Sequence, residues 1–287
     1  NTLSLAKEFG LQDKIKVFQN RDYDHLKNSD IVTNSGFVRP IDQDLIKHLK
    51  STTVIPLMWE TWEFRSSDFD LNYCKEKSIL VLGTKESEGF CDMSGYSGMI
   101  GIKILLDAGL EAAHNNILLL GSDKILTKNI YDVLKTTKCK VDWFSKNSLF
   151  ESKQYSDVSE ITSKLGIYEA IIVAEHGYNK EIIGGNGAIL PINLLQEKNP
   201  SIVIAVIAGN IDANLLYSSN LQYFPKKIMP FGFMTYQPYS LGPAPIIKLF
   251  AGGLKVGQEM SRARILGLSI DEARKIALQH SPADDFN

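Results

Sequence analysis

The chain has 287 residues, of which 44% are hydrophobic and 22% charged, and its formal net charge is -2. This is the composition of an ordinary soluble globular protein with room for two domains, which excludes a disordered or fibrous chain. Because no basic block or membrane-length apolar run occurs, nucleic acid and membrane are excluded as partners, and a small-molecule substrate is expected.

The cysteines are too few and too scattered to form a framework. Cys74, Cys91 and Cys139 include no CxxC pair, so neither disulfides nor a zinc site is predicted, and no metal is expected. The absence of a signal peptide and the free cysteines favour a cytoplasmic location. Because the chain begins at Asn1 without methionine, we expect a short leader or first strand to precede it.

The first third of the chain alternates short strands with helices. The pattern predicts helices at 3–11 and 41–50 and strands at 14–19, 30–36, 52–59 and 79–84. Such alternation is typical of a parallel sheet with crossover helices. A long helix follows at 92–113, where Gly95, Gly98 and Gly101 would permit close approach to another helix. They indicate close packing against the second domain or a partner subunit, or else an irregular helix start.

The stretch Asn116 to Asn147 predicts a strand, a tight turn, a helix and a second strand, the opening unit of a nucleotide-binding domain. A dinucleotide fingerprint has glycines at the first, third and sixth positions of this turn, where the chain has Gly121, Asp123 and Leu126. Asp123 would repel phosphate, although the helix N-terminus could still bind one. The alternative is an ordinary βαβ unit, which needs only one turn glycine.

Further strands are predicted at 170–177, 199–212 and 226–236, followed by helices at 243–265 and 269–279. Ser269 and Glu272 predict a capping box at the start of the last helix. The fold class is therefore α/β, with two Rossmann-like doubly wound parallel-sheet domains and an interdomain cleft. We expect a flavodoxin-like substrate domain at 1–92, a nucleotide-binding domain at 93–260, and a C-terminal helix at 261–287 that returns to the first domain.

Laid end to end, this order resembles the D-isomer-specific 2-hydroxyacid dehydrogenases, and the pattern covers most of the chain. Residues 29–84 look like the core of that family's substrate domain. The resemblance implies a nicotinamide cofactor and a homodimer. Its motifs are altered, however: Ile207 and Ala208 stand where the family has an arginine and a glycine, and the segment 231–243 has Tyr236 and Tyr239 but no histidine. The family's glycine-rich carboxylate-binding loop is replaced by WETWEFR at 59–65.

Ligands of an open α/β sheet sit outside the carboxyl ends of the strands, so residues that close each strand are candidates. Glu175 beside His176 suits proton transfer near neutral pH, although His176 could simply cap a strand. The WETWEFR segment offers an aromatic wall with charges, or alternatively a domain-edge loop with buried tryptophans and a Glu63–Arg65 surface pair. Catalytic candidates are His176, Glu175, Glu60, Arg65 and Tyr236, and substrate-binding candidates are Asn34, Ser35, Trp59, Trp62 and Glu63.

The cofactor candidates come from three strand ends. Ser145, Lys146 and Asn147 lie at the end of the second strand of the βαβ unit. Their hydroxyl, ammonium and amide groups suit the 2′-phosphate of NADP better than the ribose of NAD. The alternative is that these residues form a solvated turn. The full set is Gly121, Ser122, Asp123, Lys124, Ser145, Lys146, Asn147, Ala208, Gly209, Asn210 and Asp212.

Two functions follow. The first is an NAD(P)-dependent oxidoreductase that acts on an atypical small polar substrate. The second is a non-redox ligand-binding or partner-subunit protein on a dehydrogenase scaffold that has lost its cofactor, and a transferase or lyase stays open as a third.

Overall fold

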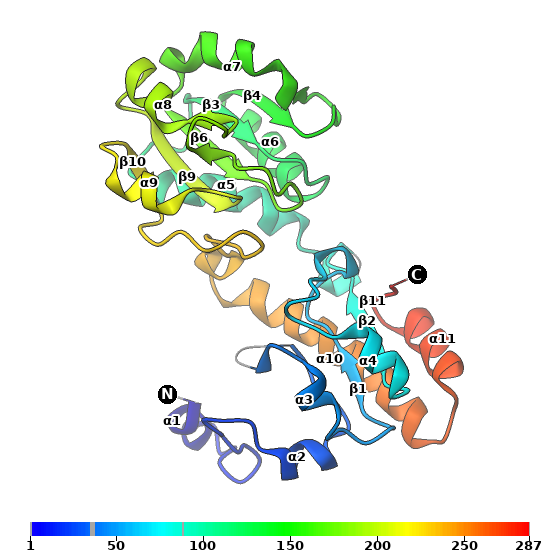
Figure 1. The fold of residues 1–287 in the computed structure, drawn as a ribbon. Coiled ribbons are helices and arrows are strands. Elements are labelled where there is room, and N and C mark those ends of the chain that lie inside the picture. Colours follow the sequence, from blue (N-terminus) through cyan, green and yellow to red (C-terminus); the bar gives the residue numbers. More distant parts are fainter. Residues whose placement is uncertain (1, 35–37, 88, 287) are drawn as a thin grey trace. The chain divides into compact units, whose positions relative to one another are not determined.

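The computed structural model describes residues 2–34, 38–87 and 89–286 (Figure 1). The chain divides into two compact units. Unit 1 joins residues 1–91 to 249–287, and unit 2 comprises residues 92–248. Among the residues described, no helix combines the length and the hydrophobicity that a bilayer crossing requires.

Unit 2 is built on a six-stranded parallel sheet with the order β10-β9-β6-β3-β4-β5. Its two central strands, β3 (Asn116–Leu120) and β6 (Ala170–Ala174), pair in parallel and lie at the point where the strand order reverses. In a doubly wound sheet this switch point is where ligands bind. The other strands are β4 (Lys140–Ser145), β5 (Lys153–Gln154), β9 (Val203–Ala208) and β10 (Gln222–Phe224).

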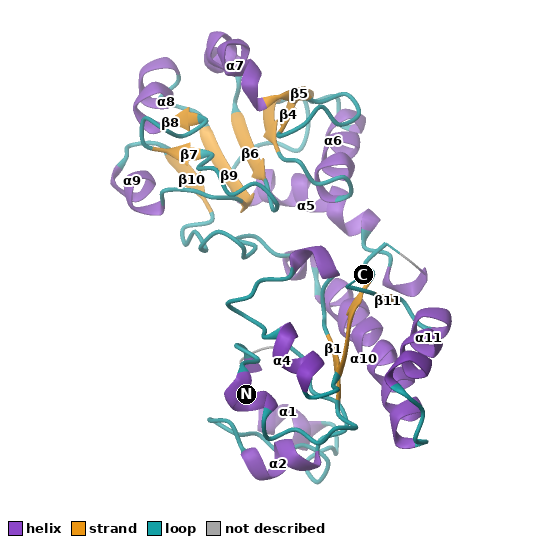
Figure 2. Cartoon of the chain, turned by 45° about the vertical axis from the view of Figure 1, so that its right-hand side comes forward, coloured by secondary structure: helices purple, strands orange, loops and turns teal. Residues whose placement is uncertain are grey.

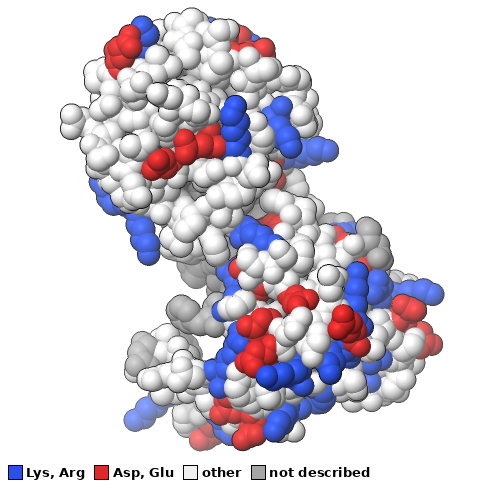
Figure 3. Space-filling model, in the orientation of Figure 1, with Lys and Arg blue, Asp and Glu red and all other residues white. Residues whose placement is uncertain are grey.

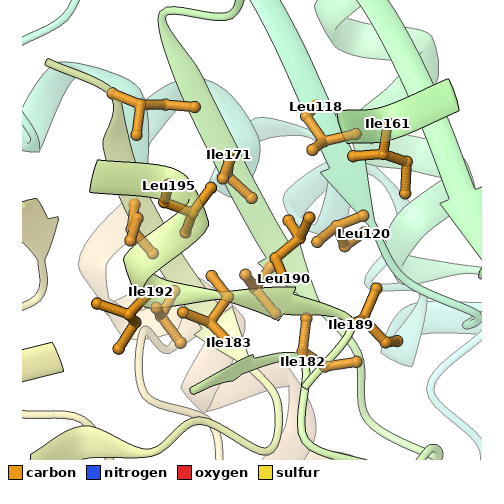
Figure 4. Close-up of a cluster of buried hydrophobic side chains, with 14 of the residues drawn as sticks. Leu118, Leu120, Ile161, Ile171, Ile182, Ile183, Ile189, Leu190, Ile192 and Leu195 are labelled. Carbon is orange, nitrogen blue, oxygen red and sulfur yellow. The ribbon is translucent and has the colours of Figure 1, made fainter. Parts of the chain in front are cut away.

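Helices cover both faces of this sheet, as Figure 2 shows. Because successive strand residues point to opposite faces, Leu118 and Leu119 join different cores. Helices α5 (Ser94–Asp107) and α6 (Leu126–Thr136) bury one face. The other face is buried by α7 (Val158–Lys164), α8 (Ile192–Lys198), α9 (Ala213–Ser218) and the short strands β7 (Ile183–Gly184) and β8 (Leu190–Pro191), whose side chains point into the cluster in Figure 4.

Two glycines explain how closely α5 packs on α6. A Cβ at Gly98 would lie 2.5 Å from Val133 Cγ2 and 2.9 Å from the Asn129 carbonyl oxygen, and one at Gly101 would lie 2.7 Å from Ile130 Cγ2. A Cβ at Gly95 would meet nothing within 4 Å. The predicted close helix packing is therefore confirmed at Gly98 and Gly101, and the helix that they contact belongs to the same unit.

Unit 1 contains a smaller sheet with the order β1-β2-β11. Strands β1 (Val54–Pro56) and β2 (Leu80–Thr84) are parallel, and β11 (Ala283–Asp284) is antiparallel to β2. Residue Ile31 adds a parallel bridge to Val54. The helices of the N-terminal segment are α1 (Thr2–Glu8), α2 (Tyr23–Asn28), α3 (Gln43–Ile46) and α4 (Leu71–Glu76).

The C-terminal segment completes unit 1 with α11 (Ile270–His280) and with α10 (Pro243–Ile265), whose residues from Leu249 onward belong to this unit. A Cβ at Gly257 of α10 would lie 2.7 Å from Pro56 Cγ, so the helix lies directly against β1. Met260 joins Leu80 and Leu82 in one buried cluster. The capping box of α11 is confirmed, because Ser269 accepts from the Glu272 N–H while the Glu272 carboxylate accepts from the Ser269 N–H.

Short 3-10 helices connect several of these elements. They are η2 (Thr61–Glu63), η3 (Gly89–Cys91), η4 (Tyr155–Asp157), η5 (Leu165–Ile167) and η6 (Pro238–Leu241).

Two predicted strands are wrong, and of the strand predicted at 30–36 the described residues 30–34 form only a bridge at Ile31, whereas residues 35 and 36 lie outside the described part of the chain. The segment 14–19 is irregular, and its Val17 and Phe18 side chains are about half exposed, so an apolar alternation without a pairing strand did not make a strand. The segment 226–236 is not a strand either, because strand β10 ends before it, at Phe224. There the chain folds on itself, with the Met229 N–H donating to Thr235 Oγ1, because Pro230 and Gly232 interrupt the segment.

Candidate functional site

The turn after β3 brings three elements into contact at Gly121. A Cβ there would lie 2.5 Å from both the Ala174 carbonyl oxygen and Thr127 Oγ1. The Thr127 hydroxyl itself donates to the Ala174 carbonyl at 3.2 Å, and the Trp143 indole N–H donates to the Gly121 carbonyl at 2.8 Å. Close approach of β3, β6 and α6 therefore explains this glycine without any nucleotide.

Asp123 occupies the N-terminus of α6. Its Oδ1 accepts the backbone N–H of Ile125 at 2.8 Å and that of Leu126 at 2.5 Å. These are N–H groups that have no partner within the helix, and a phosphate at a helix N-terminus would bind the same kind of group. The Asp123 carboxylate therefore accepts N–H groups of the kind that an anionic ligand at a helix N-terminus would use.

A hydrogen-bond network joins the ends of several strands next to this turn. Glu175, at the end of β6, has no exposed surface. Its Oε2 accepts from the Ser122 hydroxyl at 2.6 Å and from the Tyr155 hydroxyl at 2.7 Å. Ser122 Oγ in turn accepts the backbone N–H of Lys146, which follows β4, at 2.7 Å. Side chains from the turn after β3 and from η4 thus meet at the Glu175 carboxyl group, and the backbone after β4 is joined to them through Ser122.

Burial dominates the electrostatics of this network. It raises the pKa of Glu175 above its usual range, although the hydrogen bonds from Ser122 and Tyr155 act in the opposite direction. Burial also raises the pKa of Tyr155, and the neighbouring Glu175 charge adds to that rise. The tyrosine hydroxyl therefore keeps its proton and remains a donor to the carboxyl group.

A dinucleotide does not fit these side chains. The pyrophosphate of a cofactor in a doubly wound fold rests on the first helix N-terminus, at the switch point. Here Asp123 already holds the helix N–H groups, and Ser122 and Glu175 are hydrogen bonded across β3 and β6. The Asp123 carboxylate would lie beside the phosphates, which carry the same sign of charge.

The other cofactor candidates mostly have local structural partners. Ser145 is fully buried, and its hydroxyl is hydrogen bonded to Ser152 and to the Asn147 carbonyl. Asp212 caps α9 by accepting the Leu215 N–H at 3.0 Å. Ala208 is buried, Gly209 is packed near Val173, and the Asn210 amide donates to the Asn179 carbonyl. Lys124, Lys146 and Asn147 are exposed.

Two further catalytic candidates of unit 2 are His176 and Tyr236. His176 is partly buried next to Glu175 at the end of β6. The Tyr236 ring packs edge-on against Phe224, and its hydroxyl donates to Asp107 of α5. Burial raises the pKa of Tyr236, with the Asp107 hydrogen bond adding to the rise. Tyr236 is thus bonded to a helix and not to the network at Glu175.

In unit 1, the WETWEFR segment forms η2 and is held by its own side chains. Glu60 accepts from the Trp62 indole N–H at 2.7 Å and from the Glu86 N–H at 3.0 Å. Glu63 completes a capping box with Glu60. The Trp62 side chain is about half exposed, at 52%, so the alternative of a loop with buried tryptophans does not hold for Trp62.

The remaining substrate candidates of unit 1 also have defined places. Trp59 packs partly buried against the core, and Arg65 lies 3.7 Å from Asp68. The Asn34 side chain is buried and accepts the Met58 N–H at 2.7 Å. Ser35 lies outside the described residues. Among those described, no group of acidic, histidine and cysteine side chains could hold a metal ion.

Sequence reasoning missed Tyr155. It lies in η4, and nothing in the local pattern relates it to Glu175, which lies 20 positions further along the chain. A buried tyrosine needs a partner for its hydroxyl, but only the fold shows which one.

The sequence matches no protein-family model and no curated protein. Solved structures do match. A 2-hydroxyacid dehydrogenase from Ketogulonicigenium vulgare is 11% identical, with a TM-score of 0.56, over 92% of this chain and 93% of that one. The A chain of dipicolinate synthase from Bacillus subtilis is 12% identical, with a TM-score of 0.53, over 96% and 94%. The NAD+-bound 3-phosphoglycerate dehydrogenase of Entamoeba histolytica is 14% identical, with a TM-score of 0.50, over 83% of each chain.

These matches define an α/β protein with the fold of the NAD(P)-dependent 2-hydroxyacid dehydrogenases. The resemblance expected from the order of the sequence elements is confirmed at the level of the fold. Chemistry does not follow from fold alone, so the function must come from the site.

Proposed function

We propose that this protein is a non-redox member of the dehydrogenase fold, which binds a small polar ligand or serves as a partner subunit without a nicotinamide cofactor. The observation that carries the proposal is the position of the Asp123 carboxylate on the Ile125 and Leu126 N–H groups. A ligand phosphate would have to displace a carboxylate that is covalently tethered in place.

The buried carboxyl at Glu175 supports the same conclusion. A dinucleotide at the switch point would have to break the Ser122–Glu175 hydrogen bond or lie directly against it. Breaking it would remove one of the hydrogen bonds that the buried Glu175 carboxyl accepts, and a net hydrogen bond contributes about 0.5–1.5 kcal/mol. The residues that a 2-hydroxyacid dehydrogenase would need at Ile207 and in the segment 231–243 are also absent from the sequence.

A second candidate is the NAD(P)-dependent oxidoreductase. The strand order of unit 2 and the exposed Lys146 at the end of β4 favour it, because an ammonium at that strand end suits the 2′-phosphate of NADP. The Lys146 ammonium lies 5.4 Å from the centre of the Tyr178 ring. This candidate requires Asp123 to leave the helix N-terminus when the cofactor binds.

A thermal unfolding titration separates the two candidates. A ligand that binds only the folded state raises the unfolding temperature, and the rise grows with the ligand concentration. We expect no shift with NADH or NADPH up to millimolar concentrations, in a sample whose cooperative unfolding shows that it is folded. A saturable rise with either nucleotide would overturn the proposal and favour the oxidoreductase.

A further inference from the structure

A hollow of about 310 Å³ opens on unit 2 between β7, α8 and α9. This volume is at the lower end of the range for small-molecule sites, which is roughly 300–1,000 Å³. One wall is the glycine-rich turn after β7, and the other two walls come from the helices. The residues that line it are Gly184, Gly185, Asn186, Ile192, Asn193, Gln196, Leu215, Ser218 and Ser219.

The glycine wall is held rigidly from behind. The Glu181 carboxylate accepts the Gly185 N–H at 2.9 Å, and a Cβ at Gly184 would collide with that carboxylate. A Cβ at Gly185 would lie 3.9 Å from Leu215 Cδ1, so this wall and α9 approach each other at that point. Figure 4 shows Ile183 and Ile192, from β7 and α8, anchored in the same buried cluster.

The lining has no ionisable side chain. Its polar groups are three amides and two hydroxyls, and the hydroxyls of Ser218 and Ser219 donate to carbonyl groups of their own helix. Each hydroxyl oxygen therefore keeps acceptor capacity. Within the described part of the chain, the side chains of Asn186 and Gln196 make no hydrogen bond. On the face shown in Figure 3, unit 2 is mostly uncharged, whereas unit 1 carries many side chains of both signs.

Apolar surface completes the lining. Ile192 is buried at the base, and Leu215 is 43% exposed although it is large and aliphatic. Neutral donors and acceptors beside a small apolar patch match an uncharged ligand that carries hydroxyl or amide groups on a compact carbon frame. A charged ligand would lose its hydration without gaining a counter-charge.

We propose that this hollow binds a neutral, hydroxyl- or amide-bearing small molecule of monosaccharide size, with Asn186 and Gln196 as its principal hydrogen-bond partners. The inference rests on the ligand-binding form of the proposed function, in which this fold binds a small polar ligand and no nicotinamide cofactor.

N-acetylglucosamine is a suitable probe because it is neutral and carries both hydroxyls and an amide. Titrated into the isotope-labelled full chain, it is expected to shift the backbone amide resonances of Gly184, Gly185 and Asn186 in a saturable manner. Glucosamine, its cationic counterpart, is expected to bind more weakly. The absence of saturable shifts at these amides would overturn the site.

Two variants test the residues. Gln196→Ala should weaken probe binding about fivefold, which is the effect of one net hydrogen bond. Glu197→Ala is the matched control, because it changes the next, exposed position of α8 outside the hollow, and it should leave probe binding unchanged. Leu215→Trp should abolish binding by filling the hollow from an exposed position. Equal effects of Gln196→Ala and Glu197→Ala would contradict the proposal. An NADPH titration of the same samples tests the proposed function separately, because a bound nucleotide would shift the amide resonances of Ser122 and Asp123 and not those of the hollow.

Discussion

Replacing Asp123 by alanine removes the carboxylate that caps α6. The Ile125 and Leu126 N–H groups then lose their acceptor, which in a helix cap costs about 1 kcal/mol. The lost interaction with the helix dipole adds roughly 0.5 kcal/mol. We therefore expect the free energy of unfolding to fall by about 1.5 kcal/mol, measured by denaturant titration.

Asp132→Ala is the matched control, because it removes the same charge from the same helix at an exposed position. Asp132 pairs with Lys128 one turn away, and such surface pairs contribute only about 0.3–0.5 kcal/mol. If Asp123→Ala is no more destabilising than Asp132→Ala, the carboxylate does not act as a cap and the reasoning fails.

The same variant tests whether Asp123 excludes phosphate. With the N–H groups free, millimolar pyrophosphate should stabilise Asp123→Ala but neither the wild type nor Asp132→Ala. A charge-assisted hydrogen bond contributes about 1.5 kcal/mol, so the affinity should rise about tenfold. If pyrophosphate does not stabilise Asp123→Ala, the Glu175 network, and not the Asp123 carboxylate, prevents phosphate from binding.

Three further predictions concern stability. Burial raises the pKa of Glu175 in the folded state, so the stability that this carboxyl contributes is present below the unfolded pKa and is lost as pH rises through the folded pKa. The wild type should therefore lose more free energy of unfolding than Glu175→Gln between acidic and neutral pH. Parallel pH profiles of the two proteins would contradict this. Gly98→Ala should destabilise by about 1–3 kcal/mol through overpacking against Val133 and Asn129, whereas Gly95→Ala, with open space around it, should be neutral or stabilising in thermal unfolding. Ser269→Ala should lower the free energy of unfolding by about 1 kcal/mol. The Ser269→Ala/Glu272→Ala double variant should lose less than the sum of the two single variants, because the two side chains form one capping box. Strictly additive losses would argue against that coupling.

The elements that could be predicted from the sequence are those whose pattern is local. The run from Ile117 to Leu120, its turn glycine and the amphipathic helix after it determine a βαβ unit by themselves. The capping box at Ser269 is equally local. The strand expected at 14–19 failed because Val17 and Phe18 need a neighbouring strand, which the pattern cannot supply.

The candidate site was predicted only in part. Position in the chain predicts that Ser122 and Glu175 each follow a parallel strand and so lie at the same edge of the sheet. It does not predict that the two side chains are bonded to each other, nor that Tyr155 joins them. Asp123 is expected to repel phosphate, and the structure adds that its carboxylate accepts the Ile125 and Leu126 N–H groups. The homodimer and the cytoplasmic location stay predictions.

The placement of α10, α11 and β11 in unit 1 has a consequence for biosynthesis. Unit 2 is one uninterrupted stretch, so a nascent chain emerging from the ribosome can complete it before translation ends. Unit 1 cannot do so, because Leu80 and Leu82 stay uncovered until Met260 and Ala277 have been made. The N-terminal part of unit 1 is therefore synthesised before unit 2 but completed after it, and in the interval its apolar strands are exposed to chaperones and to other chains.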